Sequence, residues 1–210
     1  MDIALAIMLG LGLSAACGFR VFVPLLVLGG AARLGAASLA PSLAWMGTDE
    51  AIVCFAVATV LEIVAYKVPW LDHALDTVAT PAAVCAGAIV SASQIGAITS
   101  VSPLLQWACA IIAGGGVAGI VQAGTVTTRA VSTVGTGGLA NPLISAAQSV
   151  LSVFVSVLSV ALPILGGLFA LMAVGGCVWI VVKLRRRSRA RAARLAAART
   201  ATPPAISRAA

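Results

Sequence analysis

Five charged side chains lie inside or directly beside long apolar stretches of this sequence, and they are its candidates for chemistry: Arg20, Glu62, Asp72, Asp76 and Arg129. A charge inside a membrane-spanning segment costs about 3 kcal/mol or more unless it has a partner, water or a bound ion. Such residues therefore mark a functional site. We expect all five to bind a substrate, with Arg20 and Glu62 inside the membrane and the other three at its cytoplasmic mouth.

Arg20 is the only charged residue within residues 3–32. A half-helix that begins near Gly18 would direct free N–H groups toward an anion or a lipid headgroup beside Arg20. The alternative is a structural arginine, paired with Glu62 or with carbonyl groups of the broken helix. Glu62 has two interpretations as well: a carboxylate that carries protons or a cation, or an interfacial side chain paired with Lys67.

Asp72, His73 and Asp76 form the densest ionisable cluster. A spacing of four places the two carboxylates on one face of a helix, and paired carboxylates can hold Mg²⁺ against a phosphate. Membrane prenyl- and alcohol-phosphate transferases use similar motifs, but these contain more aspartates and a second cluster. The other interpretation is a solvated loop helix in which Asp76 and Thr80 are N-caps ahead of Pro81. We expect no catalytic residue, no metal and no cofactor.

A stripe of serines follows one face of a predicted helix near the C-terminus: Ser145, Ser149, Ser152, Ser156 and Ser159. Spacings of four and three place all five on the same side. They could line a hydrated path. Small residues at this spacing more often form a helix–helix seam, where backbones approach closely.

Residues 73–80 and 129–136 can be aligned as an internal repeat, because an alanine, a Thr-Val pair and the last threonine coincide. Internal repeats are common in transporters, whose binding sites lie between the halves. If the third apolar segment spans the membrane, the two copies face the same side. If that segment is re-entrant, they are inverted.

The elements that must position these residues are membrane helices. Hydrophobic residues make up 61% of the chain and charged residues 9%, whereas soluble domains contain about 25% charged residues. We predict an all-α polytopic bundle of about six spans, covering residues 3–32, 47–66, 81–95, 103–122, 142–161 and 163–182. The first segment would be about 45 Å long as a helix, so it must tilt or break, and we predict a turn at residues 16–18.

Residues 1–183 form the predicted transmembrane domain, and residues 184–210 a basic cytoplasmic tail that we predict to be disordered. The positive-inside rule then places both termini in the cytoplasm of a multi-pass inner-membrane protein. The tail should bind anionic lipid headgroups. It lacks aromatic residues, so we expect no nucleic-acid partner. The five cysteines are isolated in apolar segments and are predicted to be small buried hydrophobes.

Four stretches together resemble a known family: SAACGFRVFVP at 14–24, LEIVAYKVPW at 61–70, DTVATPAA at 76–83 and AGGGVAG at 113–119. Their order is similar to that in the bacterial integral membrane family catalogued as domain of unknown function 4126. The resemblance runs from about Leu11 to the sixth predicted span and leaves out the basic tail. It implies a membrane protein and brings no activity with it.

These observations favour a membrane protein that binds or passes a small solute, an ion or a lipid headgroup at a polar site within the bundle. A non-transporting scaffold or assembly subunit is the first alternative, because small-residue seams and a basic tail would suffice for it. The same glycine and serine faces would also allow a homo-oligomer. A metal-dependent lipid-phosphate enzyme is the second alternative.

Overall fold

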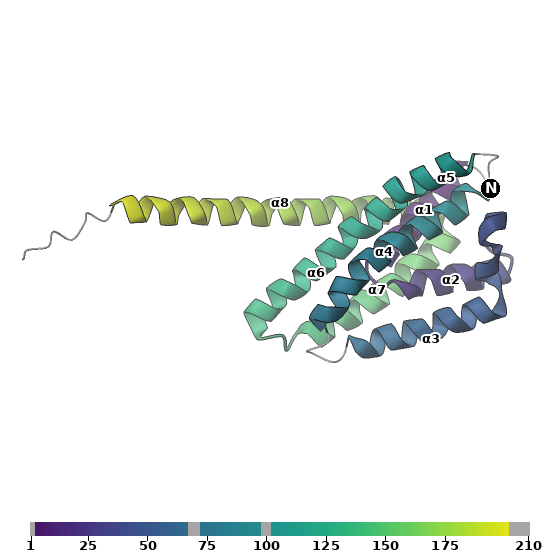
Figure 1. The fold of residues 1–210 in the computed structure, drawn as a ribbon, viewed down its shortest axis with the longest axis horizontal. Coiled ribbons are helices and arrows are strands. Elements are labelled where there is room, and N and C mark those ends of the chain that lie inside the picture. Colours follow the sequence, from purple (N-terminus) through teal and green to yellow (C-terminus); the bar gives the residue numbers. More distant parts are fainter. Residues whose placement is uncertain (1–2, 67–71, 98–101, 202–210) are drawn as a thin grey trace, which may run out of the picture.

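A computed structural model describes residues 3–66, 72–97 and 102–201, and every regular element within these ranges is a helix (Figure 1). The all-α prediction is therefore confirmed. The elements are α1 (Ile3–Cys17), α2 (Phe22–Arg33), the 3₁₀ helix η1 (Pro41–Gly47), α3 (Asp49–Ala65), α4 (Asp72–Ile95), α5 (Pro103–Cys109), the π-helical turn η2 (Ala110–Gly115), α6 (Gly116–Thr136), α7 (Asn141–Ala161) and α8 (Pro163–Ala201).

Within the described ranges, four helical stretches are long and apolar enough to cross a membrane: Leu75–Ile95, Pro103–Thr136, Asn141–Ala161 and Pro163–Lys183. The chain is thus an integral membrane protein, but the prediction of about six spans is not confirmed. α1 and α2 are apolar but contain only 15 and 12 residues. At about 1.5 Å per residue they measure roughly 22 and 18 Å, less than the ~30 Å hydrocarbon core.

α1 and α2 run in opposite directions and form a hairpin (Figure 1). The predicted break is present, because α1 ends at Cys17 and the N–H groups of residues 18–20 close a turn before α2 begins. Met8 of α1 lies against Gly167, at the start of α8. After the turn, α2 returns toward the same end of the bundle, where Gly29 contacts the backbone of Met46 in η1. The first apolar segment is therefore folded back on itself.

This hairpin bears on two predictions. Residues 3–32 form two helices instead of one, and Ile3 lies at the opposite end of the molecule from the C-terminal end of α8 (Figure 1). On which side of the membrane each terminus lies stays a prediction. The reversal depends on Gly18, where an added Cβ would lie 2.5 Å from Val121 Cβ and 2.7 Å from the Ala118 carbonyl oxygen of α6. A side chain at position 18 would prevent the turn from packing this closely against α6.

The third apolar segment is part of the continuous helix α4, which begins at Asp72 and contains Pro81. The prediction that Asp76 and Thr80 cap a helix starting at Pro81 is therefore wrong, because both lie inside α4. The two stretches of the proposed repeat occupy different places, one at the start of α4 and the other at the end of α6. They share the same end of the bundle without being equivalent elements.

The serine stripe of α7 lies mainly in a seam with the hairpin. Ser152 Oγ donates to the Ala16 carbonyl oxygen of α1 at 3.0 Å, and Ser156 and Ser159 donate to carbonyl groups of their own helix. Gly12 of α1 is so close to Gly166 that an added Cβ would lie 2.8 Å from its carbonyl carbon. This part of the stripe fits the seam interpretation, in which small residues let backbones approach.

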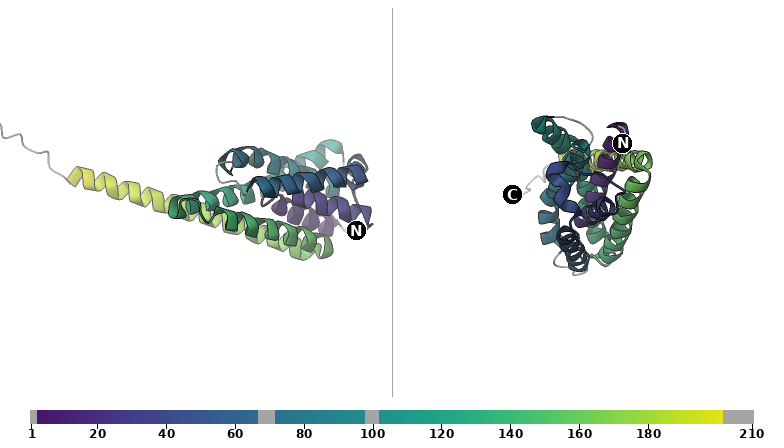
Figure 2. Two further views of the ribbon diagram at one scale, coloured as in Figure 1. Left: turned by 90° about the horizontal axis from the view of Figure 1, so that it is seen from below. Right: turned by 90° about the vertical axis from the view of Figure 1, so that its right-hand side faces the viewer.

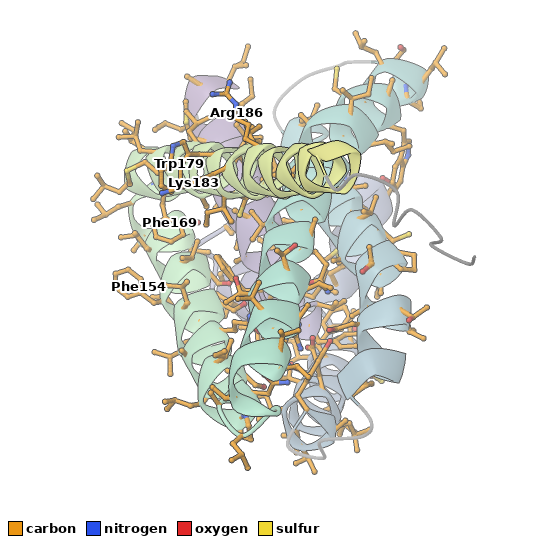
Figure 3. All side chains as sticks on the ribbon, turned by 90° about the vertical axis from the view of Figure 1, so that its left-hand side faces the viewer. Phe154, Phe169, Trp179, Lys183 and Arg186 are labelled. Carbon is orange, nitrogen blue, oxygen red and sulfur yellow. The ribbon has the colours of Figure 1, made fainter. Side chains whose placement is uncertain are left out.

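The outer faces of α7 and α8 are apolar (Figure 3). Phe154 and Trp179 are exposed there, and the Lys183 ammonium lies 4.2 Å from the centroid of the Trp179 ring. α8 continues as one helix far beyond the bundle to Ala201 (Figure 2). The sequence also suggests that this tail begins as a frayed helix, and α8 is helical up to Ala201, because alanine and arginine both have high helix propensity.

The cysteines are free, and only Cys17 is fully buried. Cys54, Cys85 and Cys109 are exposed on the bundle surface, so the prediction of burial is wrong for these three. In a membrane helix, positions in the core and positions that face lipid are both surrounded by apolar sequence. The sequence therefore does not show which cysteines are buried.

Candidate functional site

Arg20 lies at the tip of the hairpin and is 1% exposed. Its Nε donates to Ser149 Oγ at 3.0 Å, and its Nη2 donates to the Ser145 carbonyl oxygen at 2.9 Å and also to Ser145 Oγ. Both serines lie near the start of α7. The sequence offered either an anion contact or a structural pairing for Arg20, and these bonds show that the guanidinium fastens the hairpin tip to α7.

Glu62 caps the second half of the hairpin. Its Oε1 accepts a hydrogen bond from the Val21 N–H at 2.9 Å, and its Oε2 accepts one from the Phe22 N–H at 3.2 Å. These donors lie at the N-terminus of α2, where helix N–H groups lack intrahelical partners and a negative charge is stabilising. Glu62 thus holds the return helix in place. Its predicted partner Lys67 lies outside the described residues.

Tyr66 brings the two buried arginines together. The guanidinium carbon of Arg20 and that of Arg129 each lie 4.4 Å from the centroid of the Tyr66 ring. The Tyr66 hydroxyl donates to Asp76 Oδ1 at 3.1 Å. Cation–π contacts are strongest where the charge is desolvated. The Tyr66 side chain therefore contacts two guanidinium groups through its ring and one carboxylate through its hydroxyl.

Arg129 is 3% exposed and lies within α6, which continues to Thr136, beyond residue 122 where the fourth span was predicted to end. Its Nη2 forms an ion pair with Asp76 Oδ1 at 2.9 Å. Because the structure places Asp76 in the first turns of α4, this pair joins α4 to the end of α6. Loop-like composition around Arg129, with threonines and glycines, concealed a helix whose polar face is turned inward.

A cavity of about 320 Å³ lies beside this ion pair, between α4, α6 and α7. Its polar lining residues are Asp76, Thr77, Thr80, Arg129, Thr133 and Asn141. The Asn141 amide donates to Thr133 Oγ1 at 3.0 Å, which joins the start of α7 to the end of α6. The cavity is thus surrounded by hydroxyl, amide and guanidinium groups and by one carboxylate that is already paired with Arg129.

The structure brings together four of the five predicted site residues: Arg20, Glu62, Asp76 and Arg129. The fifth, Asp72, begins α4, but its side chain lies outside the described residues. Sequence reasoning treated Tyr66 only as an interfacial aromatic. Two signals could have identified it, because it is the only tyrosine in the chain and lies four residues after Glu62, on the same helix face.

Among the side chains that the structure describes, no three His, Cys, Asp or Glu residues are close enough to hold a metal ion together. The paired-carboxylate alternative needs Asp72, whose side chain is not among them. What the described site offers chemically is positive charge and hydrogen-bond donors next to a cavity.

Comparison with known proteins gives one family. The model described as "Domain of unknown function (DUF4126)" matches residues 7–183, and so confirms the resemblance found in the sequence. No curated protein and no solved structure matches the chain.

Proposed function

The chain belongs to the DUF4126 family, and we propose that this integral membrane protein binds a small anionic group in the cavity beside Arg129 and passes it across the membrane. The observation that carries the proposal is the joining of Arg20 and Arg129 at one buried ring, next to a cavity lined by hydrogen-bond donors. Anions are bound in proteins by such charge-assisted hydrogen bonds.

Two features favour an anion over a cation. Among the cavity-lining residues that the structure describes, Asp76 is the only acidic one, and it is paired with Arg129 and also accepts a bond from Tyr66. An anionic ligand could exchange with this carboxylate at Arg129, whereas a cation would meet the Arg129 guanidinium. The hydroxyls of Thr80 and Thr133 donate to the Asp76 and Arg129 carbonyl oxygens of their own helices, so each would rotate to donate to a ligand oxygen.

The re-entrant hairpin favours passage over binding alone. Transporters place half-helix ends and charged side chains deep in the membrane, where these act on substrates. Here, Arg20 occupies the hairpin tip and Glu62 caps α2. The proposal places the basic end of α8 in the cytoplasm, because the positive-inside rule assigns that side to clustered arginines. The cavity mouth then faces the cytoplasm as well.

A scaffold role is the second candidate. It is favoured by the bonds of Arg20 to α7 and of Glu62 to α2, since both charges are used to join helices. The two candidates differ at Arg129 and Thr133, which line the cavity. A scaffold has no need for a ligand there.

The test is titration calorimetry of the protein in phosphatidylcholine nanodiscs, with inorganic phosphate, sulfate and acetate as probes. We expect at least one anion to bind saturably and Arg129→Gln to weaken it tenfold or more. Arg33→Gln is the matched control, because Arg33 also pairs with an aspartate, Asp49 at 2.8 Å, but is exposed outside the cavity. Thr133→Val is the milder second variant, with Thr136→Val, outside the cavity lining, as its control.

Passage is measured by uptake of the bound anion into proteoliposomes. Uptake that is lost in Arg129→Gln and kept in Arg33→Gln would support the proposal. If no anion binds, or if both arginine variants behave alike, the anion site is wrong and the scaffold role is preferred. Binding without uptake would support an anion-binding protein and would exclude passage across the membrane.

A further inference from the structure

An apolar groove of about 400 Å³ lies on the other side of α4 from the polar cavity. Its walls are α3 and α4, and its floor is the start of α2. Representative lining residues are Phe22, Ala58, Leu61, Leu75, Ala79 and Ala82. The cavity instead meets Asp76, Thr77 and Thr80. The first turns of α4 therefore separate a polar space from an apolar one.

The groove exists because α3 and α4 are not packed along each other. α3 packs against α2 and η1, whereas α4 packs against α1, α6 and η2. Leu61 of α3 and Val78 of α4 line the groove and are 63% and 68% exposed. In a bilayer, these side chains would face lipid, so the groove is open to the hydrocarbon core from the side.

Tyr66 lies between the groove and residues of the cavity. Tyr66 lines the groove together with Glu62. Its hydroxyl donates to Asp76, and Arg129 lies over its ring, and both of these residues line the cavity. The apolar groove therefore ends at Glu62 and Tyr66, beside the Arg129–Asp76 pair.

The direction of the groove matches that of a lipid in the nearer leaflet. From Tyr66 to Ala58 the groove follows α3 for eight residues, roughly 12 Å along the helix axis. From Leu75 to Ala82 it follows α4 for a similar length. Tyr66 and Leu75 lie at the end of the bundle where α3 ends and α4 begins, and Ala58 and Ala82 lie deeper. A lipid would place its head at Tyr66 and its chain toward the membrane centre.

We propose that the ligand of this site is a membrane lipid with an anionic head, whose hydrocarbon chain lies in the α3–α4 groove and whose head reaches Arg129. The inference rests on the proposed anion site and names its substrate class. The apolar lining recognises the chain, Arg129 recognises the head, and Tyr66 joins the two. The groove and the cavity, at about 400 and 320 Å³, both fall within the usual size of ligand pockets, roughly 300–1,000 Å³.

The experiment compares two probes of the same head chemistry in phosphatidylcholine nanodiscs: radiolabelled hexadecyl phosphate and inorganic phosphate. Hexadecanol is the competitor that has the chain without the charge. The variant is Ala79→Phe, which fills the groove from a half-buried position. Cys85→Phe is its matched control, because Cys85 is exposed on the same helix and does not line the groove. Ala82→Leu is a smaller second change, used if Ala79→Phe does not give a monodisperse protein.

We expect hexadecyl phosphate to bind at least tenfold more tightly than inorganic phosphate, and hexadecanol to compete poorly. Ala79→Phe should weaken hexadecyl phosphate tenfold or more and leave inorganic phosphate unchanged, while Cys85→Phe changes neither. Equal binding of the two phosphates, or no effect of either groove variant, would overturn the lipid inference and leave the anion site standing. If neither phosphate binds, both the inference and the proposed function fail.

Discussion

The Tyr66 side chain takes part in several different contacts of the candidate site. It is 3% exposed, lies under two guanidinium groups, lines the groove and bonds to Asp76. The ring and the hydroxyl make separate contributions, because the ring faces the arginines and the hydroxyl faces the carboxylate. Substitutions can therefore remove one contribution at a time.

Tyr66→Phe should lower the free energy of unfolding by about 1 kcal/mol, the net value of one buried hydrogen bond. Tyr66→Leu should cost roughly 2 kcal/mol more, since it also removes two desolvated cation–π contacts. Both values follow from unfolding by sodium dodecyl sulfate in mixed micelles. Trp45→Leu is the control, because Trp45 is half exposed and lies in η1, away from Tyr66 and the two arginines that contact its ring. Equal losses for Tyr66→Phe and Tyr66→Leu would show that the ring does not stabilise the arginines.

The candidate site could be predicted in part at this scale. Isolated charges in apolar sequence predicted that Arg20, Glu62, Asp76 and Arg129 need polar partners, since each would be too costly in a membrane without one. The structure gives each of them such a partner. Their partners were not predictable. Arg20 bonds to Ser145 and Ser149, which lie more than a hundred residues away, and one-dimensional spacing contains no information about such contacts.

The hairpin is the element on which the site depends. It carries Arg20 into the bundle and presents the first N–H groups of α2 to Glu62. The sequence predicted the break from length and from Gly18, because about 45 Å of helix does not fit in a ~30 Å core. It could not predict the reversal, because the direction taken after a break is set by packing on α6 and α7.

Gly18→Ala should destabilise the protein by about 1–3 kcal/mol, the usual range for overpacking. The added Cβ would overlap Val121 and the Ala118 carbonyl oxygen, and these belong to a helix that cannot move independently. Gly30→Ala is the matched control in the same hairpin, because nothing lies within 4 Å of a Cβ built there. It should leave stability unchanged or raise it by up to ~1 kcal/mol.

The same two variants also test whether anion binding depends on the position of the hairpin tip. If Gly18→Ala moves the hairpin tip, anion binding by Arg129 should weaken in folded protein, because Arg20 and Tyr66 would lose their contact. A Gly18→Ala protein as stable as Gly30→Ala would mean that the tip is not seated against α6 as described.

At the scale of the whole molecule, the two ends of the bundle differ. The start of α4, the end of α6 and the C-terminal end of α8 share one end, and η1 lies at the other (Figure 1). Composition was enough to predict an all-α membrane protein. It was not enough to predict the number of crossings, because a re-entrant hairpin and a spanning helix have the same apolar composition.

The hairpin predicts that the N-terminus and the 137–140 turn lie on opposite sides of the membrane. Single cysteines at Ile3, Ala36 and Leu139 test this, since Ile3 and Leu139 are 57% and 88% exposed and Ala36 is exposed too. They are introduced after the exposed native cysteines are replaced by alanine. Labelling by a membrane-impermeant maleimide in intact cells and in inverted vesicles reports the side of each.

Ile3→Cys and Ala36→Cys should be labelled from one side and Leu139→Cys from the other, with the C-terminal arginines on the side of Leu139. A spanning first helix gives the other pattern, in which Ile3→Cys is labelled together with Leu139→Cys and opposite to Ala36→Cys. In that arrangement Arg20 would lie midway along a crossing, and Glu62 would have no free helix N-terminus to cap. The labelling of Ile3→Cys therefore decides whether Arg20 lies at the tip of a hairpin. Both the proposed anion site and the proposed lipid ligand depend on that arrangement.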